Sequence, residues 1–129
     1  MRVERLRRRP HLLVVDPDAG DRARLGGALE RHYELSFAGD AVQAVRQARL
    51  ADPDLLLIDY ALPGGSASVV VGRLRAIPEL ADLPVILVSG WDAEWSWNDL
   101  LEMEAAAFVP KPVERDGLVE EIERALAAA

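Results

Sequence analysis

Four aliphatic residues in a row, Leu-Leu-Leu-Ile at positions 55–58, limit the fold of this chain more than any other stretch. Because they do not alternate with polar residues, they predict a strand covered on both faces, as in the middle of a parallel sheet between helices. Asp59 follows this strand, and ligands gather at that edge of open parallel sheets. Asp59 is therefore either a functional carboxylate or a polar residue that ends the strand and begins a turn.

Four further apolar segments predict the other strands of the same sheet. They lie at residues 12–15, 33–37, 85–88 and 108–109. Segments with the apolar spacing of helices separate or follow them, at about 18–31, 41–50, 66–77, 91–106 and 118–126. Five strands that alternate with five helices predict an α/β fold with a parallel sheet and right-handed crossovers.

Apolar residues at helical spacing also predict which sides of two helices are buried. The residues of the expected stripe on the helix at 41–50 are Ala41, Val42, Ala44, Val45, Ala48 and Leu50. After Ser66, a residue that favours a helix start, the corresponding residues are Val69, Val70, Leu74 and Ile77. We expect these side chains to pack against the sheet.

The composition fits one domain of 129 residues that needs neither a disulfide nor a structural metal. The absence of cysteine excludes disulfides, thiolate zinc sites and cysteine nucleophiles. Nothing in the sequence places His11 and His32 together, so a histidine metal site or a serine-histidine hydrolase has little support. No apolar run is long enough for a transmembrane helix or a signal peptide, so no membrane association of the body is expected.

The net charge of −7 is unevenly distributed along the chain. Five arginines and Glu4 give the first nine residues a charge of +4, so the remainder carries −11. A body this acidic is not expected to bind nucleic acid. We expect a short basic arm at residues 1–10, followed by one domain at residues 11–129. The arm is either a solvated tail or a segment that contacts phosphate or a membrane.

If the strands are parallel, their carboxyl ends present several polar side chains along one edge. These are Asp16, Asp18, Asp59, Ser89 and Lys111. Carboxylates bind a hard cation such as Mg²⁺, and a hydroxyl and an ammonium can hold phosphoryl oxygens. A carboxylate can also act as a nucleophile towards phosphorus and form an aspartyl phosphate. The edge therefore favours chemistry that combines a metal ion with a phosphoryl group.

Four segments of the chain resemble the receiver domain of two-component response regulators. They are VVDPD (14–18), DLLLIDYALPGG (54–65), PVILVSG (84–90) and FVPKP (108–112), in the order and at the separations typical of the family. The resemblance runs from about Leu12 to the end of the chain. It implies a doubly wound, flavodoxin-like fold in which a five-stranded parallel sheet has the order 2-1-3-4-5.

The resemblance also implies roles for individual residues. Asp59 would be the phosphoacceptor, Ser89 the switch hydroxyl and Lys111 a contact to the phosphoryl group. The Lys111-Pro112 bond would be cis, a form that proline tolerates. Phe108 is either the rotating aromatic switch of the family or an ordinary core residue.

A Mg²⁺ site at Asp16, Asp59 and the backbone carbonyl of Ala61 follows from the same resemblance, with one departure. Receivers usually show two adjacent acidic residues after the first strand, the second being a direct metal ligand, and this chain has Pro17 there. Either Asp18 turns in to replace that missing ligand, or a water molecule takes the place of the ligand. Since phosphoryl transfer depends on the metal ion, the site and its reactivity are either weakened or lost.

All three tryptophans, Trp91, Trp95 and Trp97, fall within seven residues. Trp91 lies two residues beyond Ser89, so it would border the acceptor pocket and hinder attacking water. Residues i and i+6 do not share a helical face, so at least one of the three is expected to be exposed. The tryptophans form either an interface or ordinary packing of the fourth helix against the sheet.

The implied function is that of a bacterial, cytoplasmic phosphoprotein of a phosphorelay, and not of an enzyme. A sensor histidine kinase or phosphotransfer protein would phosphorylate Asp59. The face formed by the fourth helix, fifth strand and fifth helix would then change its affinity for an effector domain, a partner protein or a second copy. The alternative is a pseudo-receiver that binds partners without being phosphorylated, which Pro17 favours. An aspartate-nucleophile phosphatase has less support, because it needs a second aspartate where this chain has Ala61.

Overall fold

The computed structural model describes residues 9–90 and 95–129, and its strands form one parallel sheet. The strands are β1 (His11–Val15), β2 (Glu34–Ala38), β3 (Leu55–Ile58), β4 (Val85–Ser89) and β5 (Ala107–Pro110). They follow the order β2-β1-β3-β4-β5, and each neighbouring pair is parallel. The predicted fold class and strand order are therefore confirmed.

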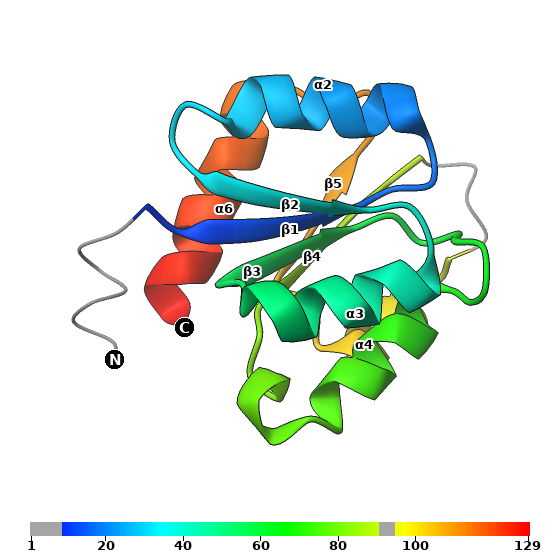
Figure 1. Cartoon of the computed structure of the whole chain (residues 1–129). Helices are drawn as coiled ribbons and strands as arrows, with labels where there is room; N and C mark the ends of the chain where they lie inside the picture. The colour runs from blue at the N-terminus through cyan, green and yellow to red at the C-terminus, as the bar shows by residue number, and fades with distance from the viewer. Residues whose placement is uncertain (1–8, 91–94) are drawn as a thin grey trace.

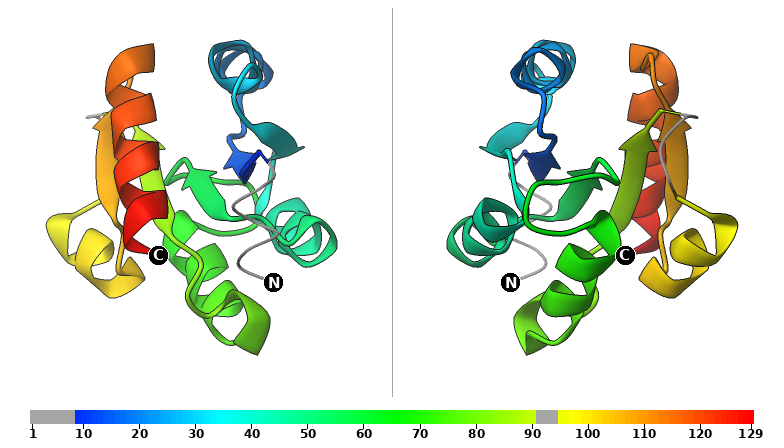
Figure 2. Two further views of the ribbon diagram at one scale, coloured as in Figure 1. Left: turned by 90° about the vertical axis from the view of Figure 1, so that its left-hand side faces the viewer. Right: turned by 90° about the vertical axis from the view of Figure 1, so that its right-hand side faces the viewer.

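Helices cover both faces of the sheet (Figure 1). They are α2 (Ala19–Leu29), α3 (Ala41–Ala51), α4 (Ala67–Arg75), the short 3₁₀ helix η1 (Pro78–Leu80), α5 (Trp97–Met103) and α6 (Arg115–Ala128). Helices α2 and α6 pack on one face, and α3 and α4 lie side by side on the other (Figure 2). Among the described helices, none has the length and apolar character needed to cross a bilayer.

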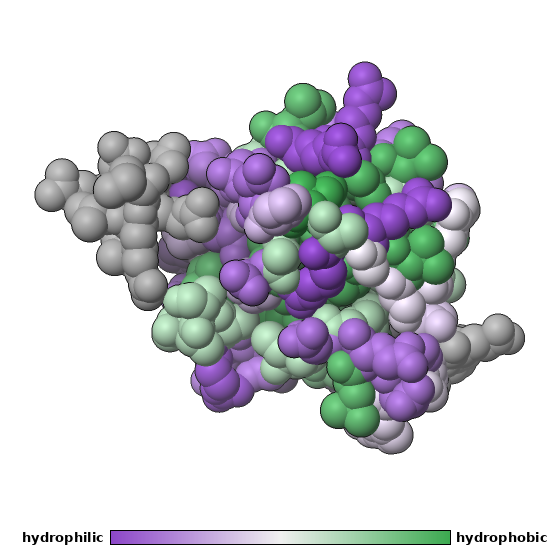
Figure 3. Space-filling model, turned by 90° about the horizontal axis from the view of Figure 1, so that it is seen from below, coloured by the Kyte–Doolittle hydropathy of each residue, from purple (hydrophilic) through white to green (hydrophobic). Residues whose placement is uncertain are grey.

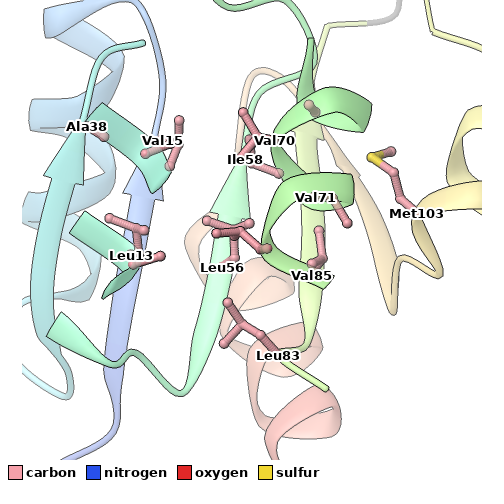
Figure 4. Packing of buried hydrophobic residues seen from close by; sticks show 14 of the residues in the cluster. Leu13, Val15, Ala38, Leu56, Ile58, Val70, Val71, Leu83, Val85 and Met103 are labelled. Atoms are coloured by element: carbon pink, nitrogen blue, oxygen red, sulfur yellow. The ribbon is translucent and has the colours of Figure 1, made fainter. Parts of the chain in front are cut away.

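Successive residues of β3 point into two separate cores. Leu56 and Ile58 pack towards α3 and α4 (Figure 4), whereas Leu55 and Leu57 pack towards α2 and α6. All four side chains are buried. The uninterrupted aliphatic run is explained by this arrangement, because a parallel strand with helices on both sides has no face in water.

Three predicted core positions are wrong. Val42 and Leu50 on α3 are 67% and 72% exposed, and Val69 on α4 is 44% exposed. The buried face of α3 consists of alanines from Ala41 onward, and a helix turns by roughly 100° per residue, which puts Leu50 opposite Ala41. On the face of the molecule seen from below, exposed hydrophobic residues lie among hydrophilic ones (Figure 3).

The helix predicted at residues 91–106 is shorter in the structure. It begins after Ser96, whose hydroxyl accepts the backbone N–H of Asp99 while the Asp99 carboxylate accepts the backbone N–H of Ser96. Such a capping box marks a helix start. The helix ends before Glu104, which has a left-handed φ of 52°. Trp95 precedes the helix, and the prediction for residues 91–94 lies outside the described residues.

Arg75 of α4 connects this helix to two other segments. Its guanidinium donates to the carbonyls of Ala81 at 2.9 Å, Leu83 at 2.7 Å and Met103 at 3.2 Å. Replacing Arg75 by methionine is expected to lower the free energy of unfolding by about 2 kcal/mol, because these carbonyls lose a charged donor. Urea denaturation checks this, with the exposed Arg73→Met on the same helix as the control. Equal urea midpoints for the two variants would contradict the role of Arg75.

Candidate functional site

The carboxyl ends of four strands bring Asp16, Asp59, Ser89 and Lys111 together. Lys111 Nζ donates to Asp16 Oδ2 and to Asp59 Oδ2, each at 2.6 Å. Ser89 Oγ donates to Asp59 Oδ1 at 2.9 Å. Both oxygens of Asp59 are thus bound by side chains from the β4 and β5 side of the sheet.

The register of the parallel strands produces this arrangement. Val15 of β1 pairs with Ile58 of β3, so Asp16 and Asp59 follow paired residues of two adjacent strands. The ladder continues past the strand ends, since the backbone N–H of Asp59 donates to the carbonyl of Val15 at 2.9 Å. At the other side, the N–H of Lys111 donates to the last carbonyl of β4 at 3.0 Å. The four side chains therefore emerge at one edge.

The Lys111-Pro112 peptide bond is cis, as the resemblance implied.

A third carboxylate, absent from the sequence prediction, reaches Lys111 from α2. Asp21 Oδ2 accepts from Lys111 Nζ at 2.9 Å. Asp18 lies at the N-terminus of α2, where its Oδ1 accepts the backbone N–H of Asp21 at 2.9 Å and caps the helix. The sequence could have predicted a place for Asp21 near the site. A residue three positions after an N-cap lies in the first helical turn, next to the strand ends.

Burial and charge act in different directions within this cluster. Burial raises the pKa of Asp16 above its ordinary value, although Lys111 and the backbone N–H of Asp18 donate to its carboxylate. Burial opposes the charge on Lys111, but hydrogen bonds to Asp16, Asp59 and Asp21 outweigh it and raise the pKa of Lys111 above its ordinary value. Lys111 is therefore charged at neutral pH, and it faces an excess of carboxylates.

A pocket of about 860 Å³ opens beside these groups, between α2 and the loop after β5. Its lining includes Asp59, Ser89, Lys111, Asp21 and Arg115. The candidate phosphoacceptor can thus be approached from outside, past a rim that carries both acidic and basic side chains.

Aromatic side chains lie next to the β4 and β5 edge of the site. The ring of Trp95 is 4.4 Å from that of Phe108 and 5.2 Å from that of Trp97, between ring centroids. Trp95 Nε1 also donates to the carbonyl of Gly90 at 3.3 Å. Trp97 is 66% exposed, which confirms that at least one tryptophan faces solvent. Trp91 lies outside the described residues.

The donor set at this edge suits a hard cation. The carboxylates of Asp16 and Asp59 already share one cation, the ammonium of Lys111, and carboxylate oxygens are the ligands that Mg²⁺ prefers. Within residues 9–90 and 95–129, no group of three or more His, Cys, Asp or Glu side chains is arranged to hold a metal. Water commonly completes the coordination of Mg²⁺ at one or two carboxylates. The further ligand predicted from the sequence, the backbone carbonyl of Ala61, lies in the loop after β3.

Comparisons with known proteins agree with this fold. The family model of the response regulator receiver domain matches residues 12–123. The chain is 30% identical over 103 residues to the response regulator PleD of Caulobacter vibrioides, covering 80% of this chain and 23% of PleD. It is 31% identical over 109 residues to the two-component response regulator ORR8 of Oryza sativa subsp. indica, covering 81% of this chain and 88% of ORR8.

Solved structures show the same likeness. The crystal structure of a putative response regulator from Chloroflexus aurantiacus has a TM-score of 0.86 and 27% sequence identity, covering 93% of this chain and 99% of that one. This chain belongs to the family of response regulator receiver domains of two-component systems. Receiver domains are signalling domains that work with histidine kinases and effector domains.

Proposed function

We propose that this receiver domain accepts a phosphoryl group on Asp59 from the phosphohistidine of a sensor kinase or phosphotransfer protein, in a bacterial cytoplasm. The observation that supports this proposal is the pair of donors on Asp59, the Ser89 hydroxyl on Oδ1 and the Lys111 ammonium on Oδ2. In the transfer, the P–N bond of phosphohistidine breaks and a P–O bond to the Asp59 carboxylate forms. The two donors are placed to bind oxygens of the phosphoryl group, where negative charge increases.

Mg²⁺ is part of this proposal. The carboxylates of Asp16 and Asp59, with the backbone carbonyl of Ala61, would hold the ion, which would neutralise charge on the phosphoryl group. The support is the excess of acidic groups, because three carboxylates surround the single ammonium of Lys111. This excess favours a divalent cation at the edge of the sheet.

The output of the domain would be a change in protein contacts on the α5, β5 and α6 face. Trp95 links that face to the loop after Ser89, since it contacts Phe108 and donates to the carbonyl of Gly90. Trp97 and Leu101 of α5 are 66% and 76% exposed and lie four residues apart, on one side of the helix. They offer an apolar contact to an effector domain, a partner protein or a second copy.

Pro17 supports a second candidate, a pseudo-receiver that binds partners without phosphorylation. The place of the usual second acidic ligand is taken by a residue without a carboxylate, and Asp18 is engaged as the cap of α2. In this case Asp16, Asp59 and Lys111 would form an ion cluster whose role is structural.

Tryptophan fluorescence with added Mg²⁺, and then beryllofluoride, separates the two candidates. Trp95 reports on the loop after Ser89 through its hydrogen bond to Gly90. For a phosphoacceptor we expect a saturable change that requires Mg²⁺ and disappears in Asp59→Asn, a variant that keeps the shape of the side chain. Intact mass after incubation with acetyl phosphate gives a direct readout of the same reaction. No response at about millimolar ligand, with an unchanged mass, favours the pseudo-receiver.

A further inference from the structure

Lys111 is the only lysine in the sequence, and three carboxylates hold its ammonium. Asp16 and Asp59 are the two carboxylates proposed to bind Mg²⁺. Asp21 is different, because it comes from α2 and not from a strand end. The Lys111 side chain is 20% exposed and that of Asp21 is 27% exposed, so their contact is shielded from water in part.

The local structure of α2 directs Asp21 towards the pocket. The helix starts with Asp18 as its cap, and the cap hydrogen bond fixes the backbone of Asp21 in the first turn. On its other side, the Asp21 carboxylate pairs with Arg24. Hydrogen bonds from Arg24 and Lys111 hold the pKa of Asp21 below its ordinary value, so this carboxylate is charged at neutral pH.

Lys111 and a metal ion would compete for the same oxygens. The ammonium lies 2.6 Å from Oδ2 of both Asp16 and Asp59, so a cation bound by these two carboxylates weakens their contact with Lys111. A charge that loses its partners inside a half-buried pocket is costly. Asp21 is the third partner of Lys111 and is not needed for the metal ion.

We propose that Asp21 is a positioning residue that keeps hold of Lys111 when Asp16 and Asp59 bind Mg²⁺, and that it thereby lessens the competition between Lys111 and the ion. It acts through Lys111 and not as a direct metal ligand. The part of this inference that concerns Mg²⁺ rests on the proposed function, whereas the hold on Lys111 does not.

The direction of the effect follows from charge. Without the Asp21 carboxylate, the partners left to the ammonium among the described residues are the two carboxylates that the metal ion needs, so it competes with the ion more strongly. The pocket also loses one negative charge near the proposed ion. Both changes weaken Mg²⁺ binding, and together we expect about a tenfold increase in its dissociation constant.

The single lysine permits a direct experiment on the full chain. Protein labelled with ¹⁵N in lysine has one side-chain ammonium signal, and the exchange of its hydrogens with water reports how firmly Lys111 is held. This exchange is measured below neutral pH for wild type, Asp21→Asn and Asp21→Glu. Asp116→Asn is the matched control, because Asp116 lies in the first turn of α6 beside Arg115 as Asp21 lies in the first turn of α2 near Arg24. Mg²⁺ binding to the same proteins is measured by tryptophan fluorescence.

We expect ammonium exchange about fivefold faster in Asp21→Asn, partial rescue in Asp21→Glu, and rates within about twofold of wild type in Asp116→Asn. Exchange in Asp21→Asn equal to that in wild type overturns the inference. So does an equal effect of Asp116→Asn, which would assign the change to helix stability. If wild type itself does not respond to Mg²⁺, the proposed metal dependence fails, and the exchange rates still decide whether Asp21 holds Lys111.

Discussion

Replacing Lys111 by methionine is expected to lower the free energy of unfolding by about 3 kcal/mol at neutral pH, because the variant leaves charged carboxylates in the pocket without their cation. Methionine keeps an unbranched apolar stem of four atoms and lacks the ammonium, so the loss is assigned to the ammonium. Its three contacts, to Asp16, Asp21 and Asp59, are all within 2.9 Å. Thermal or urea denaturation measures the difference.

The pH dependence of this loss has a defined sign. The pKa of Lys111 is raised by its carboxylate partners. While these partners are charged, the contribution of Lys111 is fully present below its ordinary pKa of 10.5 and is lost as pH rises through the folded-state pKa. At acidic pH Asp16, whose pKa is raised by burial, takes up a proton and no longer needs a cation. The destabilisation by Lys111→Met should therefore shrink as pH falls, and Mg²⁺ should restore part of the stability at neutral pH.

Arg124→Met is the control for this experiment. Arg124 pairs with Glu121 on α6, but its side chain is 73% exposed, and an exposed pair contributes at most about 1 kcal/mol. A loss in Lys111→Met no larger than that in Arg124→Met, or one that stays constant down to acidic pH, would contradict the assigned electrostatic role.

Leu56→Ala is expected to have a similarly large effect, about 3.5 kcal/mol, through the loss of packing in the core. Leu56 is fully buried. It lies in the cluster formed by the sheet with α3 and α4, where its neighbours include Leu13 and Val71 (Figure 4). Helices pack on both faces of β3, so the surroundings have little freedom to close the cavity.

Leu50→Ala provides the matched control for Leu56→Ala. The residue change is the same, but Leu50 is 72% exposed on α3, and we expect a change within about 0.5 kcal/mol. Urea denaturation at one pH compares both variants with wild type. A loss below about 1 kcal/mol in Leu56→Ala would mean that the core around β3 is loosely packed.

Some parts of the candidate site were predictable because they depend on local sequence and on one topological rule. An aliphatic run ends at Asp59, another ends at Ser89, and a short apolar segment precedes Lys111. Since parallel strands share their carboxyl edge, side chains that follow them must lie together. The structure brings these residues into hydrogen-bond contact, as the strand register requires.

Contacts made by helices were predicted less well. The Asp21 contact joins residues 90 positions apart and exists only because α2 begins beside the loop after β5. From the sequence, Asp18 suits two roles, as a helix cap or as a metal ligand. In the structure it caps α2. Val42 and Leu50 are apolar but exposed, since small alanines form the close contact of α3 with the sheet.

By itself, the sequence of this protein determined the kind of sheet, the order of its elements and the acidic, hydroxyl and ammonium groups at one edge. These features follow from uninterrupted aliphatic runs and from the residues that end them. Only the tertiary structure decided that Asp21 shares Lys111 with Asp16 and Asp59, and that Trp95 lies against Phe108. Such contacts depend on where whole helices and loops pack. The spacing of residues along the chain predicts which side chains share one face of an element, but not which element packs beside it.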